Sequence, residues 1–322
     1  MNVPETIAIV AIARPEGLRA ASVGDVMKRI LLEEAKPRNR FCRELGEDML
    51  ADRVIGAPWR SRDEPGLTRE TLDALFANEI PCIRIAGFAT ADECRAFVAA
   101  MDAVGLNKEY QVASPSVRAL PKYIGVPQFE YRKQTKAAYF AEVEPAYADR
   151  AKVFAHCGFD PIARLIERVR AVVPELPIGL AHEPGFGRYY AGIIRETTGG
   201  TNLHMDFARF SAPDYVIGAN VAQIATNFYA AGTAAGGETT VYNHHFEPTV
   251  PAGTYYEIAP LDPARVAASE SYTFAPRAGD VVMFNSRNPH RVHFNPNDDG
   301  TRRMGIGSFI GRRPTGELVL WS

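Results

Sequence analysis

Two short stretches of the chain carry the residues with the clearest chemistry. Leu203–Phe207 contains His204 and Asp206, separated by a single residue. Side chains alternate between the two faces of an extended segment, so these two ligand-type side chains share a face. A second stretch, Pro289–His293, contributes His290 from far along the chain. Two imidazoles and one carboxylate form the facial triad of non-haem Fe(II) oxygenases, which leaves half of the coordination sphere open for a co-substrate and O2.

The residues within the first stretch favour a metal-binding strand. Apolar Leu203, Met205 and Phe207 alternate with His204 and Asp206, and such alternation indicates one buried face and one polar face. The ordinary alternative is that Asp206 caps a turn and His204 faces solvent. The three-residue motif does not decide between these interpretations by itself, because His-x-Asp recurs by chance.

The second stretch offers two histidines for one coordination position. His290 and His293 are three residues apart, so on a strand they point to opposite faces and cannot bind one metal together. We prefer His290, because it directly follows the turn of Asn285–Pro289. The neighbouring pair His244 and His245 is expected to be exposed near a turn, with at most a role at the rim of a site.

The composition of the chain excludes several classes of protein. Its 322 residues with 46% hydrophobic content are enough for one large domain, or for one domain with an extension. The net charge of -2 comes from 36 basic and 38 acidic residues without a long Lys/Arg block, so no nucleic-acid partner is expected. The apolar run Ile7–Ile12 is too short to span a membrane and lacks the basic segment of a signal peptide.

The cysteines point to the compartment. Scattered cysteines without C-x-x-C spacing are typical of reduced thiols in a cytosolic protein. We therefore expect a soluble cytoplasmic protein. Because the sequence shows neither a peptide groove nor a nucleic-acid signal, its expected partner is a free small molecule. The four cysteines are Cys42, Cys82, Cys94 and Cys157.

Residues 1–75 are expected to form a helical extension without chemistry. A strand-like run covers Thr6–Ile12, and helical patterns follow over Val23–Glu34 and about Arg40–Arg53. A loop with prolines and a glycine then separates this part from the rest. Packing or dimerisation is the expected role of the extension, which keeps a homodimer as an option.

Helices are predicted next, mainly as a layer over residues 76–175. Thr68 and Thr90 are good N-caps, and Glu93 completes a capping box with Thr90. Further helices are predicted over Lys136–Cys157 and Asp160–Val173.

From about residue 176 the chain consists of short β-rich runs broken by Gly, Pro and Asn. Many short strands with turn signals are typical of a sandwich or a jelly-roll barrel, and helices followed by strands predict an α+β fold. The predicted strands are Pro81–Ala86, Arg188–Arg195, Ile217–Tyr229, Glu238–Tyr242, Asp280–Phe284, Arg291–Phe294, Arg303–Ile310 and Glu317–Trp321.

The region around the distal histidine resembles the end of the double-stranded β-helix of Fe(II)/2-oxoglutarate oxygenases. Gly279-Asp280 opens an apolar strand, His290 follows a turn, and Arg302-Arg303 opens the next strand. In that superfamily an arginine at this place binds the far carboxylate of 2-oxoglutarate, for which its planar fork is suited. Only one of the two arginines can point inward. The order Gly-Thr-Arg favours Arg302, with Arg303 as the substitute.

The chain resembles one branch of this superfamily more closely, the carrier-independent halogenases of hapalindole-type alkaloids. That resemblance rests on Gly236–Tyr242, His290–Val292, Arg302-Arg303, Gly305–Phe309 and Glu317–Ser322. It implies an oxygenase domain over residues 76–322 with a cupin-like, jelly-roll core over 176–322.

The resemblance implies an enzyme that binds Fe(II) through His204, Asp206 and His290. Its co-substrates would be 2-oxoglutarate and O2, with succinate and CO2 as products. The halogenases have Gly at the position of Asp206, and that vacancy holds chloride on the iron. Because the carboxylate is present here, the resemblance implies a hydroxylase that acts on an unactivated C–H bond.

Several alternatives remain at this point. Desaturation, cyclisation or epimerisation can occur on the same iron, because these reactions differ only in the later fate of the substrate. A cupin-like binding protein without turnover is a different class, and the complete ligand set with an arginine argues against it. A zinc hydrolase would need a general base, and no H-E-x-x-H motif offers one.

The substrate is expected to be an amino-acid derivative or a natural-product intermediate. Polar residues on neighbouring strands and aromatic residues of the irregular segment 105–135 are candidates to line its pocket. Each also has an ordinary explanation, since such side chains often only bond or pack with one another. The candidates are Gln223, Asn227, Tyr229 and Arg209, with Tyr123, Phe129 and Tyr131 from the irregular segment.

Overall fold

The computed structural model describes residues 42–44, 50–53, 58–105, 108–109, 122–131, 134–197, 200–233, 235–248, 255–257, 261–294 and 301–322. All of them belong to one compact unit, Arg40–Ser322. The predicted strand Thr6–Ile12 and helix Val23–Glu34 lie outside the described residues. The role assigned to residues 1–75 stays a prediction.

The helices predicted from Thr68 onward, and the N-caps Thr68 and Thr90, are confirmed. The Oγ1 atoms of Thr68 and Thr90 accept hydrogen bonds from the first turns of α2 and α3, and the Glu93 carboxylate accepts from the Thr90 amide at 2.9 Å. None of the helices in the described residues has the length and apolarity that crossing a membrane requires. The α-helices are α2 (Arg69–Phe76), α3 (Ala91–Val104), α4 (Lys136–Cys157), α5 (Pro161–Val172) and α6 (Ala208–Ser211), and the 3-10 helices are η2 (Gln128–Tyr131), η3 (Val216–Ala219) and η4 (Pro263–Val266).

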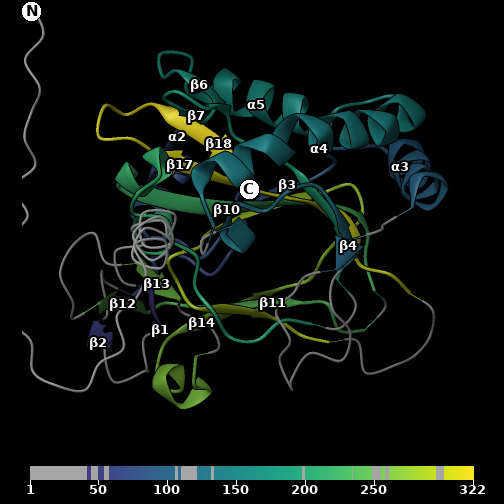
Figure 1. The fold of residues 1–322 in the computed structure, drawn as a ribbon. Helices are drawn as coiled ribbons and strands as arrows, with labels where there is room; N and C mark the ends of the chain where they lie inside the picture. The colour runs from purple at the N-terminus through teal and green to yellow at the C-terminus, as the bar shows by residue number, and fades with distance from the viewer. Residues whose placement is uncertain are drawn as a thin grey trace, which may run out of the picture. The chain divides into compact units, whose positions relative to one another are not determined.

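A nine-stranded, largely antiparallel sheet is the largest element of the described residues. Helices α3, α4 and α5 cover one of its faces (Figure 1). Its strands run in the order β3 (Ile83–Ile85), β15 (Val281–Asn285), β10 (Ala222–Ala231), β17 (Met304–Arg312), β9 (Ile193–Glu196), β5 (Lys122–Ile124) and β4 (Lys108–Glu109), and β18 (Leu318–Trp321) pairs with β17 and β6 (Ile178–Leu180).

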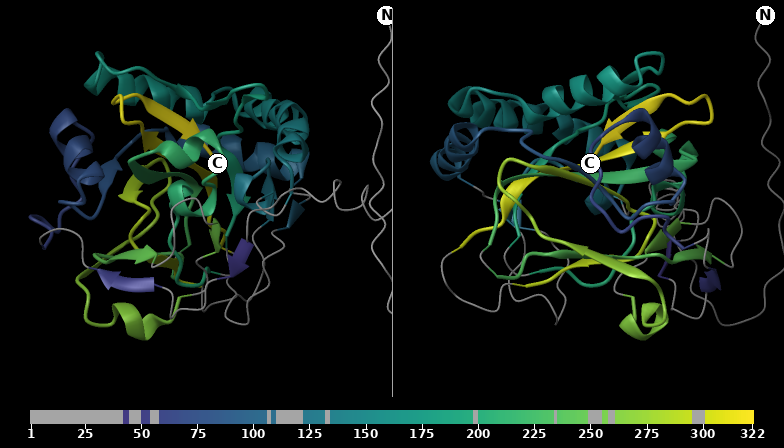
Figure 2. Two further views of the ribbon diagram at one scale, coloured as in Figure 1. Left: turned by 60° about the vertical axis from the view of Figure 1, so that its left-hand side comes forward. Right: turned by 180° about the vertical axis from the view of Figure 1, so that it is seen from behind.

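A three-stranded sheet lies on the opposite side of the large sheet from these helices (Figure 2). Its order is β14 (Ser271–Phe274), β11 (Thr239–Tyr242) and β16 (His290–Val292). Three two-stranded pairs complete the described strands: β7 (His182–Glu183) with β8 (Gly187–Arg188), β1 (Cys42–Glu44) with β13 (Tyr255–Glu257), and β2 (Leu50–Arg53) with β12 (His245–Pro248).

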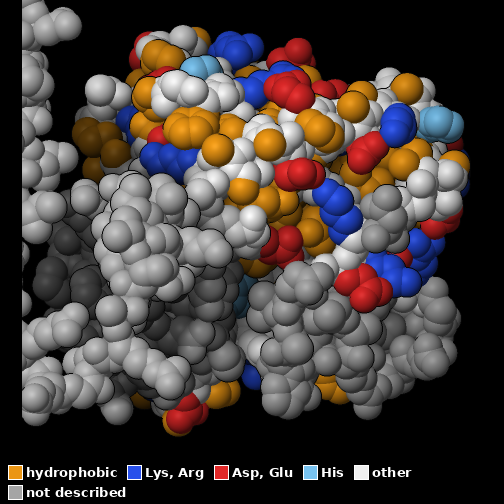
Figure 3. All heavy atoms as spheres, in the orientation of Figure 1, with side chains coloured by type: hydrophobic (Ala, Val, Ile, Leu, Met, Phe, Trp, Pro, Cys, Tyr) orange, Lys and Arg blue, Asp and Glu red, His pale blue; other side chains and the backbone are white. Residues whose placement is uncertain are grey.

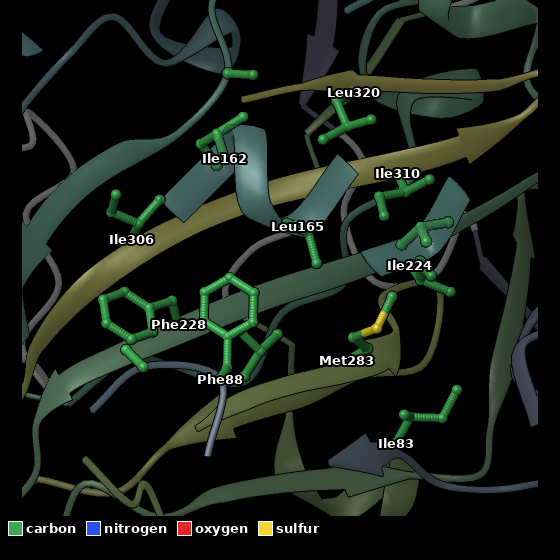
Figure 4. Close-up of a cluster of buried hydrophobic side chains, with 14 of the residues drawn as sticks. Ile83, Phe88, Ile162, Leu165, Ile224, Phe228, Met283, Ile306, Ile310 and Leu320 are labelled. Atoms are coloured by element: carbon green, nitrogen blue, oxygen red, sulfur yellow. The ribbon is translucent and has the colours of Figure 1, made fainter. Parts of the chain in front are cut away.

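Alternation along β10 separates two parts of the core. Ile224 and Phe228 face the helices together with Ile306 of β17 (Figure 4). Ala225 and Tyr229 face the other way, into a cluster that includes side chains of β11 and β14. The space between the two sheets is therefore the interior of a jelly roll, which confirms the predicted α+β, double-stranded β-helix fold.

The helix predicted at about residues 40–53 is wrong for the residues that the structure describes. Cys42–Glu44 pairs in parallel with β13, and Leu50–Arg53 pairs antiparallel with β12. These partners lie about two hundred residues away, so long-range pairing overrides the local pattern. The predicted strand Ile217–Tyr229 also begins late, because residues 216–219 form a 3-10 helix.

The surface of the helical side carries charges of both signs in alternation, with no extended area of one sign on the face in Figure 3. This agrees with the balanced composition. Cys82, Cys94 and Cys157 are free thiols.

Candidate active site

His204, Asp206 and His290 each bring one ligand-type atom to a common point. These atoms lie within 4.8 Å of one another. The Asp206 Oδ2 atom is 3.8 Å from His204 Nε2 and 3.5 Å from His290 Nε2. The three predicted ligands are thus brought together, and their donor set fits an Fe(II) ion.

The backbone fixes two of these residues directly against each other. His204 and His290 form an isolated antiparallel bridge, in which each amide donates to the other residue's carbonyl at 3.0 and 2.7 Å. The Asp206 amide donates to the Ser286 carbonyl at 2.8 Å, next to the end of β15. Residues 204–206, the ligand segment, therefore form backbone hydrogen bonds to both sheets.

Hydrogen bonds orient both imidazoles. The Nδ1 atom of His204 is 2.7 Å from the Asn202 carbonyl, and the Nδ1 atom of His290 is 2.9 Å from the Asn288 carbonyl. An Nδ1–H that donates to a carbonyl leaves the Nε2 lone pair for a metal. Burial lowers the pKa of His204 to about 4, and the neighbouring His290 adds to this effect. The imidazole of His204 is therefore neutral near pH 7, which is the metal-binding form.

The triad is surrounded by protein but keeps accessible surface. The exposed fraction of the side chain is 24% for His204, 37% for Asp206 and 6% for His290. The His290 ring packs edge-on against Phe284 of the large sheet, with ring centroids 4.8 Å apart. The ligands therefore line the space between the two sheets.

Gln223 supports the ligand segment. Its Nε2 atom donates to the Asp206 carbonyl at 3.1 Å, and its Oε1 atom accepts from the Ala208 amide at 2.8 Å. Both ends of this buried amide are engaged by the backbone that carries Asp206. The structure therefore places Gln223 as a support of a metal ligand, whereas the sequence suggested a substrate contact.

A buried amide network supports the other side of the triad. The Asn288 side chain donates to Asn78 Oδ1 at 2.7 Å, Asn78 donates to Asn243 Oδ1 at 2.9 Å, and Asn243 donates to Glu270 at 3.2 Å. The carbonyl of Asn288 is the one that holds His290. No sequence pattern predicts this network, because its members come from four separate segments.

The two neighbouring arginines point in opposite directions, and Arg303 points inward where the order Gly-Thr-Arg favours Arg302. Arg302 forms ion pairs with Glu196 and Asp102, each at 2.7 Å, at the outer surface. Arg303 is only 6% exposed, and its Nη2 atom donates to the Tyr229 hydroxyl at 3.1 Å. Met304 packs with the core beneath the helices, so alternation directs Arg303 to the jelly-roll interior.

Sequence reasoning missed Arg195 of β9. Its Nη2 atom donates to Asn227 Oδ1 at 2.8 Å, so it lies on the same interior face as Asn227 and Tyr229. The sequence pattern predicts Arg195 only as the end of a strand. A sequence pattern could have pointed to Arg195: it is a basic residue at an inward-facing position of the strand that comes just before His204.

Other candidate residues lie away from the triad or serve packing. His293 Nε2 is 2.7 Å from Thr240 Oγ1 on the outer face of the small sheet. Arg209 is exposed on α6, and its contact with a substrate stays a prediction.

The expected exposure of His244 and His245 is also wrong. Both side chains are buried, at 6% and 4%. The reason is that His245 begins β12, which pairs with β2. Of the aromatic candidates in the irregular segment, Tyr123 donates to Glu130 at 2.6 Å and Tyr131 packs edge-on against Tyr139. Phe129 is half-buried at the edge of the same aromatic cluster.

Two curated proteins are similar in sequence. Leucinostatins biosynthesis cluster protein S of Purpureocillium lilacinum is 30% identical over 208 residues, which cover 62% of this chain and 84% of that protein. L-γ-glutamyl-L-propargylglycine hydroxylase of Streptantibioticus cattleyicolor is 38% identical over 138 residues, which cover 41% of this chain and 48% of that protein. The second match therefore spans about half of that relative.

A solved structure and a family model complete the comparison. The N-substituted L-amino acid dioxygenase of Burkholderia ambifaria matches with a TM-score of 0.50 at 13% identity over 79% of this chain and 91% of that chain, a likeness of fold. The model of the carrier-protein-independent halogenase WelO5 matches residues 63–321. Together with the His-Asp-His cluster, this match confirms the predicted resemblance and the dependence on iron and 2-oxoglutarate. The chain belongs to the family of the carrier-protein-independent halogenase WelO5, a family of Fe(II)/2-oxoglutarate oxygenases.

Proposed function

We propose that this protein hydroxylates an unactivated C–H bond of a small molecule, with release of succinate and CO2. The observation that carries the proposal is Asp206, which completes the cluster with His204 and His290. In the halogenases that the chain resembles, a glycine at this position leaves room for chloride. A carboxylate in that place favours hydroxylation over halogenation.

His204, Asp206 and His290 would hold the iron on one side. When bound, Fe(II) with 2-oxoglutarate and O2 supplies the oxidising power that C–H hydroxylation needs. The protein's own contribution is binding and orientation. The bridge between His204 and His290 and the support of Asp206 by Gln223 keep the ligand atoms in place.

Arg303 is our candidate for binding the far carboxylate of 2-oxoglutarate. Its guanidinium is buried next to Tyr229, with the carbon Cζ 4.9 Å from the centre of that ring. Burial lowers the pKa of Arg303 because the cation loses solvation there, and a bound carboxylate would stabilise the charged form. Arg302 is already paired with two carboxylates, which makes it the weaker candidate.

An amino-acid derivative or a natural-product intermediate is the proposed substrate class. One relative is named a hydroxylase of a γ-glutamyl amino acid, and another is named for a biosynthesis cluster. The substrate would enter the space between the sheets, where the accessible surface of Asp206 and His204 lies.

The test is a substrate screen by mass spectrometry with purified protein, Fe(II), 2-oxoglutarate and O2. A product heavier by one oxygen atom, formed only with 2-oxoglutarate, is the expected result. A product lighter by two hydrogen atoms would replace hydroxylation with desaturation or cyclisation. A chlorinated product in chloride buffer would contradict the role given to Asp206.

A further inference from the structure

We infer that the substrate of this enzyme carries a carboxylate, and that Arg195 binds it. This inference rests on the proposed function and specifies its substrate class. It is drawn from the placement of a second guanidinium inside the jelly roll, separate from Arg303.

Strand register places Arg195 on the interior face of the large sheet. Arg195 of β9 is paired with Gly305 of β17, and Gly305 is paired with Tyr229 of β10. Residues that are directly opposite on neighbouring strands share a face. Arg195 therefore faces the same interior as Tyr229, the partner of Arg303.

A glycine makes room for the Arg195 side chain. The guanidinium crosses β17 at Gly307 to reach the side-chain oxygen of Asn227 at 2.8 Å. A Cβ atom on Gly307 would lie 2.5 Å from Arg195 Nη2 and 2.9 Å from its Cζ. Gly307 has no side chain and so leaves room for the guanidinium. The side-chain amide of Asn227 on the next strand then holds it across the interior.

In the described parts of the chain Arg195 forms no salt bridge with a carboxylate, and its positive charge acts on Asp206 only over a longer distance. Its recorded hydrogen bond goes to the neutral amide of Asn227, whereas Arg302 on the outside is paired with two carboxylates. Burial lowers the pKa of Arg303, and the positive charge of Arg195 adds to that lowering. Two cations thus lie near each other in a partly desolvated space, which is costly unless anions join them.

When the formal charges of all groups in the complete site are added, one positive charge remains unbalanced. Fe(II), the Asp206 carboxylate, the two carboxylates of 2-oxoglutarate and Arg303 together have no net charge. Arg195 adds one positive charge, which the carboxylate of a substrate would balance. A guanidinium is suited to this because its planar fork binds both oxygens of a carboxylate.

The experiment compares carboxylic acids with their primary amides. Probes are L-γ-glutamyl-L-alanine and N-acetyl-L-leucine, each with a free or an amidated C-terminal carboxylate. Each probe is titrated anaerobically into protein loaded with Fe(II) and 2-oxoglutarate, and the visible absorption of the iron centre is followed. For at least one pair, we expect the wild type to bind the acid at least about 30-fold more tightly than the amide.

Variants assign that preference to Arg195. Arg195→Gln should reduce the preference to less than about threefold while changing the affinity for 2-oxoglutarate by less than about threefold. Gly307→Ala should also reduce it, because the new methyl group displaces the guanidinium. Arg302→Gln removes the same charge from the outer surface and should retain the full preference.

Two results would overturn the inference. One is a wild type that binds neither acid more tightly than its amide. The other is a loss of 2-oxoglutarate affinity in Arg195→Gln, which would assign Arg195 to the co-substrate. The proposed function fails separately, if the wild type shows no 2-oxoglutarate-dependent absorption and releases no succinate.

Discussion

His204 and His290 lie directly opposite each other where the segment with His204 and Asp206 meets the small sheet. Their backbones exchange two hydrogen bonds, at 3.0 and 2.7 Å, and their ring centroids are 4.3 Å apart. This bridge therefore sets both the distance between the two backbone segments and the distance between the two imidazole rings. The positions of these two ligands depend on the register of β16 and not on a flexible loop, which favours a site formed before metal arrives.

The two neighbouring arginines should differ sharply when each is replaced by glutamine. Arg303→Gln removes the buried guanidinium beside Tyr229, and the KM for 2-oxoglutarate is expected to rise about 30-fold. Arg302→Gln breaks ion pairs at the outer surface and should change that KM by less than about threefold. Steady-state succinate formation at varied 2-oxoglutarate measures both. Equal effects, or a larger effect at Arg302, would return the role to Arg302.

Replacing Gln223 should weaken metal binding without removing a ligand. Gln223→Leu retains the apolar bulk but loses the hydrogen bonds to the Asp206 carbonyl and the Ala208 amide. Loss of such a supporting group typically lowers metal affinity about 10-fold or more. An anaerobic titration with Co(II), read by its visible absorption, gives the dissociation constant. An affinity equal to that of the wild type would show that the Asp206 segment does not depend on this amide.

Asn78 should contribute to stability through both its side chain and its backbone. It has a positive φ of 61° and donates to Asn243 while accepting from Asn288. Asn78→Gly retains the favourable backbone and should lower the free energy of unfolding by about 1–3 kcal/mol through lost buried hydrogen bonds. Asn78→Ala should lower the free energy of unfolding by about 1 kcal/mol more than Asn78→Gly does, because alanine is strained in the left-handed backbone conformation at this position.

Urea unfolding of the two Asn78 variants measures this difference. Equal values for Gly and Ala would show that the backbone conformation contributes nothing. Wild-type stability in both variants would contradict a structural role for the buried network.

The capping box of α3 should make stability depend on pH. The hydrogen bond from Arg164, with that from the Thr90 amide, lowers the pKa of Glu93 from 4.5 to about 2. Because the folded-state pKa lies below the unfolded value, the stabilisation is present above 4.5 and is lost as pH falls toward 2. The difference in Tm between the wild type and Glu93→Gln should therefore be largest near neutral pH and shrink below pH 4.5. A difference that is constant with pH would contradict the lowered pKa.

The cluster of His204, Asp206 and His290 could be predicted because the directions of these side chains follow from local rules. His204 and Asp206 share a face by strand alternation, and His290 is separated from His293 by the same rule. The caps at Thr68 and Thr90 are also local, and both helices begin where these residues predict. The jelly roll follows from many short strands after the helices, which is a pattern of the whole chain.

The features that could not be predicted depend on contacts between distant segments. Arg303 points inward because pairing with β10 sets the register of β17, which the order Gly-Thr-Arg does not reveal. Arg195 gains its position from Gly307 on another strand. Residues 42–44 and 50–53 are strands only through partners at 255–257 and 245–248.

The most direct test of the account is Fe(II)-dependent conversion of 2-oxoglutarate to succinate by the wild type and by single alanine variants. Succinate should form with the wild type and fall to background in His204→Ala, Asp206→Ala and His290→Ala. His293→Ala is the matched control, because His293 bonds to Thr240 outside the cluster, and it should retain wild-type turnover. A wild type that neither binds Fe(II) nor forms succinate, or a His293→Ala variant as inactive as His290→Ala, would contradict the assignment of the iron site.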